Sequence, residues 1–355
     1  MLIPGLSGHE DRVRKRIAAM LDGMGAVSRS DRLGNLISTF EGDPDAPPVM
    51  LFTHMDQLGF VVRKIREDGL VRVERLGGVP ERAVASQAVT LCVAEGRDVA
   101  GVIANMSHHA TPPEEKHVVV PVRDVVVDTG HASKSELEAA GVRIGTPVVY
   151  SPRVVELAGD RIAGTSVDDR AGCAVLLEVA HALTARVGGP TVHVVFAVQE
   201  EFNLRGAVVA ARALAPDIAI QVDIMLATDN PGMVERGSME LGAGPGISLY
   251  SFHGRGTLNG VIPHPAMVEL FVDTAASEGI SLQRSAQCGV LTDNSYVQVV
   301  GEGAAVIDAG FPLRYSHSSL EVCDLADLEE LTRLLIACIG NVGPEFSVLR
   351  DREQP

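Results

Sequence analysis

The amino-acid sequence predicts an α/β fold, in which helices flank a mixed, mainly parallel sheet and a small β-rich domain is inserted into this layer. Two observations lead to this prediction. Near both ends of the 355-residue chain, short apolar runs alternate with segments of helical spacing, a pattern typical of strands joined by helices. Between them, short valine-rich segments are separated by glycine turns. We therefore expect a discontinuous main domain of residues 1–59 and 156–355 and an inserted domain of residues 60–155.

The N-terminal part of the main domain begins with a predicted helix. Ser7 can cap this helix, because Glu10 lies three residues further on, which is the spacing of a capping box. Apolar residues follow at helical spacing at positions 13, 17, 20, 21 and 24. The run 49–52 is apolar throughout, so we expect a strand that is buried on both faces.

The inserted part is predicted to consist of strands and turns. The valine-rich segments that we expect to be strands are 71–73, 88–93, 118–120 and 148–150. Residues 105–117 contain two adjacent prolines followed by two adjacent glutamates, so this segment is predicted to be an exposed loop.

Strands and helices alternate again after about residue 156. Continuous apolar runs predict strands at 192–198 and 218–222. Apolar residues recur at helical spacing in four segments, namely 171–183, 206–214, 265–278 and 325–339. This alternation predicts a mainly parallel sheet, because parallel neighbours need a crossover connection, which is usually a helix.

Composition limits the partners of the protein. The chain has 30 Lys and Arg against 46 Asp and Glu, a formal charge of −16, which argues against nucleic acid and against an anionic membrane surface. No secretory signal is recognised at the N-terminus, and no stretch approaches the ~18 apolar residues of a membrane span. The five cysteines are scattered without a CxxC pair, so we expect buried, unpaired thiols in a cytoplasmic protein.

Polar residues that could carry chemistry fall at the ends of the apolar segments. His54 follows the run 49–52, and Asp223 directly follows the strand predicted at 218–222. The complete set is His54, Asp56, Asp168, Asp169, Glu200, Glu201, Asp223 and His317. Each residue alone could be a helix cap or a surface group. Because ligands bind at the carboxyl ends of strands in open α/β sheets, their joint occurrence predicts one site at this edge.

The residue types in this set suit a pair of divalent ions. Two imidazoles and several carboxylates, without a thiolate, favour ions such as Zn²⁺, Co²⁺ or Mn²⁺. Two ions ~3.5–4 Å apart need a bridging carboxylate and terminal ligands on each side. One more carboxylate must stay free to take a proton from water, and Glu200 and Glu201 could divide these roles. Asp56, two residues after His54, could bind the second nitrogen of its imidazole and fix the tautomer.

The order and spacing of these residues resemble the M42 family of metallo-aminopeptidases, which belongs to the dizinc exopeptidases. The stretches that carry the resemblance are Asp31–Ile37, His54–Phe60, Val167–Gly172, Gln199–Glu201, Leu204–Ala207 and Arg314–Ser318. They extend over nearly the whole chain, from about Ser7 to about Cys338. No single stretch is specific, but their combination is.

The resemblance implies a ligand set for two divalent ions per subunit, with zinc as the first choice and cobalt or manganese as the others. Asp168 would bridge the two ions. His54 and Asp223 would complete one site, and Glu201 and His317 would complete the other. These assignments come from the family and not from the spacing of the residues.

The resemblance also implies a base, a domain role and an assembly. Glu200 would be the general base, and Asp56 would orient His54. The peptide bond between Asp168 and Asp169 is expected to be cis. Residues 60–155 would form a PDZ-like dimerisation domain, and the family's assembly is a homo-oligomer built from dimers, a tetrahedral dodecamer.

We therefore expect a metal-dependent aminopeptidase that hydrolyses the N-terminal residue of short peptides with a free N-terminus. A deacylase or amidase that acts on a small acylated metabolite with the same two ions remains an alternative. A glycosidase, which also needs paired carboxylates, and a non-catalytic peptide-binding protein are further alternatives.

The sequence departs from the family pattern at a few positions. Gln57 stands where many members have Glu, Phe202-Asn203 where a hydrophobic residue and Gly are frequent, and Ser319 where Pro often follows. Gln57 and Asn203 could alter the substrate pocket, so the preferred N-terminal residue cannot be copied from a relative.

Overall fold

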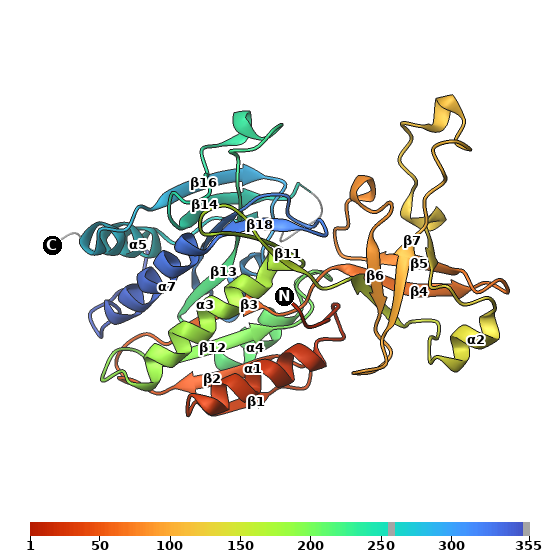
Figure 1. Cartoon of the computed structure of the whole chain (residues 1–355). Helices are drawn as coiled ribbons and strands as arrows, with labels where there is room; N and C mark the ends of the chain where they lie inside the picture. The colour runs from red at the N-terminus through yellow and green to blue at the C-terminus, as the bar shows by residue number, and fades with distance from the viewer. Residues whose placement is uncertain (255–259, 351–355) are drawn as a thin grey trace.

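The structure, a computed structural model, describes residues 1–254 and 260–350. Within these residues, a nine-stranded mixed sheet has helices on both faces, and a closed six-stranded barrel projects from one side of this main unit (Figure 1). The expected α/β fold with an inserted β-rich unit is therefore confirmed.

The main sheet is parallel at its centre, and most of the strand pairs toward its margins are antiparallel. Its strands lie in the order β1 (Ser28–Ser30), β2 (Leu36–Phe40), β12 (Val192–Ala197), β3 (Val49–His54), β13 (Ile218–Leu226), β17 (Ala305–Leu313), β14 (Gly246–Phe252) and β15 (Gly260–Val261), and β16 (Gln283–Cys288) pairs with β14. The neighbours β12, β3, β13 and β17 are parallel. Every residue of β3 and β17 is buried, which explains why the strand predicted at 49–52 has no polar face.

Helices bury both faces of this sheet. One face is covered by α1 (Asp11–Gly23), α3 (Val167–Thr184), α5 (Pro265–Glu278) and α7 (Leu325–Gly340). The other face is covered by α4 (Gly206–Leu214) and the short α6 (Asn294–Val297). The four helices predicted in the C-terminal half are all present, with differences only at their ends. Among the described residues, no helix is both long and apolar enough to cross a membrane.

The inserted unit is a barrel with its own apolar core. Its strands are β4 (Gly59–Ile65), β5 (Val71–Leu76), β8 (Val126–Asp128), β7 (Val99–Ile103), β6 (Ala88–Leu91) and β9 (Pro147–Tyr150), in this order around the barrel. Phe60 and Tyr150 pack edge to face inside it, with ring centroids 5.9 Å apart. The unit also contains α2 (Lys134–Ala139) and the 3₁₀ turns η1 (Glu81–Ala83), η2 (Pro113–Glu115) and η3 (Val122–Asp124).

A small third sheet lies where the chain returns from the barrel. It consists of β10 (Val154–Glu156), β11 (Arg161–Gly164) and β18 (Glu321–Asp324). The chain enters α3 directly after β11, and β18 leads directly into α7. A further 3₁₀ turn, η4 (Val234–Arg236), follows β13.

Three local predictions are wrong. Ser7 does not cap α1, whose N-cap residue Glu10 makes no capping hydrogen bond; the Ser7 hydroxyl instead donates to the buried carboxylate of Asp56. Residues 118–120 do not form a strand. They lie in the long excursion of residues 104–125 between β7 and β8, where they are exposed and pair with no strand. Cys288 is exposed rather than buried, because it ends β16, which pairs only with β14.

The close pairing of β13 and β17 leaves no room for a side chain at Gly310. Gly310 is the register partner of Asp223, and a Cβ atom at this position would overlap the Asp223 backbone carbonyl. The strand that presents Asp223 therefore depends on glycine in its neighbour.

We predict that Gly310→Ala lowers the free energy of unfolding by about 2–3 kcal/mol, because the two strands must separate to admit the methyl group. Urea unfolding of the purified protein measures this loss. The matched control is Gly340→Ala at the end of α7, where no heavy atom lies within 4 Å of the added carbon. This control should be neutral or slightly stabilising. Equal stability of the Gly310 variant and the parent would contradict the prediction.

Candidate active site and metal centre

The polar residues predicted from the strand ends converge on one cavity. His54 ends β3, Glu200 and Glu201 follow β12, and Asp223 lies within β13. The cavity has a volume of about 820 Å³ and is lined by these four residues together with Asp168 and His317. Asp56 is fully buried behind them. The structure thus places all seven of the assigned residues at one edge of the sheet, as the parallel topology predicts.

Asp168 lies between the two histidines. Its Oδ1 is 3.1 Å from Nε2 of His54, and its Oδ2 is 3.5 Å from Nε2 of His317. On the far side, Nε2 of His317 is also 3.6 Å from Oε1 of Glu201. One carboxylate that directs one oxygen toward each of two imidazoles has the arrangement needed by a bridging ligand.

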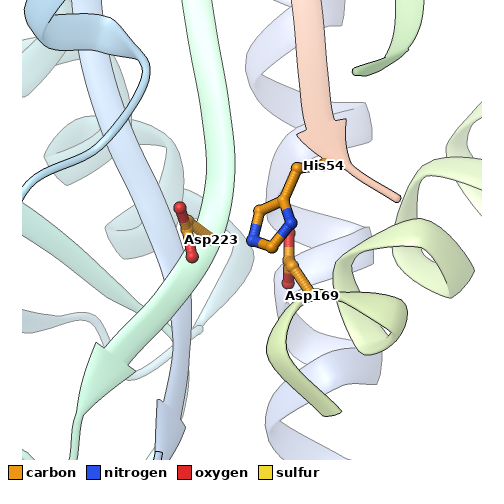
Figure 2. Close-up of side chains that lie close together, drawn as sticks. All are labelled: His54, Asp169 and Asp223. Carbon is orange, nitrogen blue, oxygen red and sulfur yellow. The ribbon is translucent and has the colours of Figure 1, made fainter. Parts of the chain in front are cut away.

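Within the part of the chain that the structure describes, two groups of residues could each hold a metal ion. The first consists of His54, Asp169 and Asp223, and the second of Asp168, Glu201 and His317; within each group the donor atoms lie within 4.8 Å of one another. Figure 2 shows the first group, with the His54 ring directed between the carboxylates of Asp169 and Asp223. Nitrogen and oxygen donors without thiolate fit divalent ions such as zinc, cobalt or manganese.

Asp169 is the member of these groups to which neither the residue chemistry nor the resemblance assigned a role. It adjoins Asp168 through a cis peptide bond, as the resemblance led us to expect. Thr53 donates its hydroxyl to Oδ2 of Asp169, and the backbone N–H of Gly172 donates to Oδ1 at 3.2 Å. Each oxygen of Asp169 therefore accepts one hydrogen bond, and the bond from Gly172 joins this carboxylate to the start of α3.

Asp56 holds three parts of the site together. Its Oδ1 is 3.4 Å from Nδ1 of His54. The backbone N–H groups of Glu200 and Glu201 donate to its two oxygens at 3.0 and 3.1 Å. Burial opposes ionisation, but His54 and the hydrogen bonds from Ser7 and Glu200 hold the pKa of Asp56 below its usual value.

Another acid that the sequence did not single out is Glu321 on β18. It is buried, and its side chain accepts hydrogen bonds from the backbone N–H groups of Asp168 at 3.0 Å and His317 at 2.6 Å. It therefore fixes two of the proposed ligands relative to each other. The available signal was its position at the start of a short strand, between the apolar residues Leu320 and Val322, because a buried carboxylate needs partners.

The inserted unit also contributes to the site. Nδ1 of His317 is 3.1 Å from the backbone carbonyl oxygen of Gly78, which follows β5, and Gly78 and Pro80 line the cavity. Of the two departures expected to alter the pocket, Asn203 lines the cavity, whereas Gln57 does not. The Gln57 side chain instead accepts hydrogen bonds from the backbone of Gly5 and from the buried Arg170.

The carboxylates of the site repel one another in a buried environment. Burial, followed by the charge of Asp168, raises the pKa of Glu201 and of Asp223 to about 7. Burial and the charges of Asp223 and Glu201 raise the pKa of Glu200 well above its usual value. Burial lowers the pKa of His317, but Glu201 and Asp168 outweigh it and raise the value to about 9. Divalent cations bound in this cavity would neutralise the excess negative charge of its carboxylates.

Comparison with solved structures places the chain in the class of the aminopeptidases. The structure is similar to aminopeptidase APDkam598 of the archaeon Desulfurococcus kamchatkensis, with a TM-score of 0.89 and 33% identity over 97% of this chain and 93% of that one. It is also similar to the TET1 peptidase of Pyrococcus horikoshii, described as assembling into a tetrahedron or a large octahedral shell, with a TM-score of 0.84 and 28% identity over 95% and 96% of the two chains.

The particular family follows from the sequence. The family model of the M42 glutamyl aminopeptidases matches residues 34–334. SgcX, a candidate aminopeptidase of Escherichia coli (strain K12), is 37% identical over 98% of this chain and 93% of its own length. The chain belongs to the M42 family and is an aminopeptidase, a hydrolase that acts on peptide bonds. The resemblance is thereby confirmed, whereas the roles of single residues and the domain boundaries stay predictions.

We predict that the metal-free protein loses stability as the pH rises. Folding raises the pKa of Glu201 from 4.5 and that of Asp223 from 3.8, in both cases to about 7. Between about pH 4 and 7, the two groups are therefore protonated in the folded state and ionised in the unfolded state. A rise in pH through this range favours the unfolded state, which binds fewer protons. His317, raised from 6.5 to about 9, acts in the same direction at higher pH. The free energy of unfolding should therefore fall by about 2 kcal/mol or more between pH 5.5 and 8.5.

Urea unfolding of chelator-treated protein at a series of pH values tests this expectation. Glu201→Gln removes one of the titrating groups and should flatten the dependence. Exposed Glu114→Gln is the control and should leave it unchanged. A stability that rises steadily from pH 5.5 to 8.5 would contradict the prediction.

Proposed function

We propose that the protein hydrolyses the N-terminal residue of short peptides that have a free N-terminus, with two divalent metal ions in the cavity. The observation that supports this most directly is the position of Asp168, which directs one oxygen toward His54 and the other toward His317. The membership of the M42 family supports the peptide substrate.

The residues of the cavity divide into two ligand sets. His54 and Asp223 would hold one ion, and Glu201 and His317 would hold the other. Asp168 would bind both ions. Zinc is the first choice of metal, with cobalt and manganese as alternatives. When bound, the two ions supply Lewis acidity that acidifies water and polarises the scissile carbonyl group.

Glu200 is the proposed general base. It lines the cavity, and its Oε2 lies 4.0 Å from Nε2 of His54, so its carboxylate adjoins the proposed ligands. A carboxylate at this position is placed to take a proton from water and to return it to the leaving amine. Asp56, fixed by Ser7 and by the backbone of Glu200, orients the imidazole of His54.

The proposal extends to the assembly and the compartment. We propose that residues 60–155 form a PDZ-like dimerisation domain of a homo-oligomer, with the tetrahedral dodecamer as its closed form, and that residues 1–59 and 156–355 form the catalytic domain. Exposed apolar residues in the excursion of the inserted unit support an interface there, namely Met106, Val118, Val119 and Val120. A cytoplasmic location is supported by the five cysteines, none of which forms a disulfide.

A panel of aminoacyl chromogenic substrates tests the function. We expect hydrolysis that EDTA abolishes and that added Zn²⁺, Co²⁺ or Mn²⁺ restores. Each substrate is paired with its N-acylated form, because an aminopeptidase requires the free amine whereas a deacylase or amidase does not. Preferred cleavage of the acylated forms would replace the proposal with the deacylase alternative, and full activity in EDTA would refute the metal-dependent mechanism.

We predict that Glu200→Gln retains both ions but loses about 10²–10⁴-fold in kcat, because the amide cannot accept the proton from water. Elemental analysis measures the bound metal, and the same chromogenic substrates measure turnover. Glu114→Gln in the exposed loop is the control and should match the parent in both. Turnover of the Glu200 variant near the parental rate would refute the assignment of the base.

A further inference from the structure

Gln221 lies two residues before Asp223 on β13, so both side chains are on the same face of the sheet, the face covered by α4 and α6. Gln221 is completely buried and does not line the cavity. Its Nε2 donates a hydrogen bond to Oδ2 of Asp223 at 3.0 Å. The residues of β13 before Asp223 are otherwise apolar. A buried amide among them is costly unless hydrogen bonds satisfy it.

The orientation of the Gln221 amide is fixed by its other end. Its Oε1 accepts a hydrogen bond from the backbone N–H of Asn294 at 2.8 Å. Because an amide oxygen can only accept and an amide nitrogen can only donate, the NH₂ group must be the end that faces Asp223.

Asn294 is in turn held by β17. Its Nδ2 donates to the backbone carbonyl of Ile307 at 3.0 Å and to Oδ1 of Asp308 at 2.6 Å. Thr292 donates its hydroxyl to the other oxygen of Asp308 at 2.9 Å. Asp308 is the register partner of Gln221 on the neighbouring strand. The amide of Gln221 is therefore fixed between Asp223 on its own strand and Asn294 at the start of α6. Asn294 is in turn bound to β17.

We infer that Gln221 is a positioning residue for the metal site, which holds the carboxyl group of Asp223 in the orientation needed by one of the two ions. Gln221 occupies one acceptor position on Oδ2, and the backbone N–H of Ile224 occupies one on Oδ1 at 2.7 Å. A carboxylate has about four acceptor positions, so each oxygen keeps one for a metal ion. This inference rests on the proposed function and adds the residue that prepares one of its ligands.

A purely structural role for Gln221 would have a different consequence. Loss of a buried hydrogen bond would then lower the stability of the metal-free protein and leave the two metal affinities alike. A positioning role predicts an asymmetric effect instead, because Gln221 contacts Asp223 but none of Asp168, Glu201 and His317.

The test uses Gln221→Met, which keeps the length of the side chain and removes the amide donor. Metal-stripped full-length protein is titrated with Co²⁺ and, separately, with Zn²⁺, and the bound ions are counted by absorption spectroscopy and elemental analysis. We expect one ion to bind about 10–100-fold more weakly while the other binds within a few-fold of the parental affinity. At limiting free metal the stoichiometry should fall from two ions to one.

The matched control is Gln298→Met at the end of α6. The Gln298 amide donates to the backbone carbonyls of Gly260 at 2.8 Å and Ser295 at 3.2 Å and has no proposed ligand as a partner. This variant should bind both ions as the parent does. If Gln221→Met does not fold, Gln221→Asn is used, because its amide is one methylene too short to span Asn294 and Asp223 and the same one-site loss is expected.

The outcomes separate this inference from the proposed function. Weakened binding of a single ion in the folded Gln221 variant supports the positioning role. Two ions bound with parental affinities in that variant refute it and leave the proposed function intact. A parent protein that binds no divalent ion refutes the proposed function and the inference together.

Discussion

The repulsion among buried carboxylates at one edge of the parallel sheet is the constraint on which the site depends. Asp168, Asp169, Glu200 and Asp223 are buried together, with Glu201 half-buried beside them, and the pKa of all but Asp168 is raised. Carboxylates cannot all remain ionised at such spacing without cations between them. The fold therefore maintains an arrangement that is unfavourable by itself, and divalent ions would convert this electrostatic cost into binding energy.

The surroundings of the site show how the fold maintains this arrangement. Asp56 accepts hydrogen bonds from the N-terminal segment and from the backbone after β12, and Glu321 accepts them from the start of α3 and from the loop of His317. These two acids join segments that are far apart in the sequence. Gln221 performs a similar task on β13, where it connects Asp223 to Asn294 at the start of α6. Such contacts fix the direction of a donor atom, and metal sites depend on direction as much as on the identity of the ligand.

The inserted barrel has a separate apolar core and yet lines part of the candidate active site. Gly78, which follows its strand β5, places its carbonyl oxygen 3.1 Å from His317. A change in the position of the barrel would therefore alter the environment of this histidine. This contact gives a physical route by which an assembly made through the barrel could influence the site.

The sequence by itself determined the α/β class, the presence of an inserted β-rich unit and the candidate residues, because hydrophobic periodicity and the location of polar residues next to apolar strands are local properties. His54, Glu200, Glu201 and Asp223 could be recognised in this way, and the M42 resemblance assigned their roles. Only the tertiary structure decided that Ser7 supports Asp56 instead of capping α1, and that Glu321 and Gln221 adjoin proposed metal ligands. These partners come from distant segments or from the geometry of a side chain, and no local pattern records which buried polar group a hydrogen bond will join.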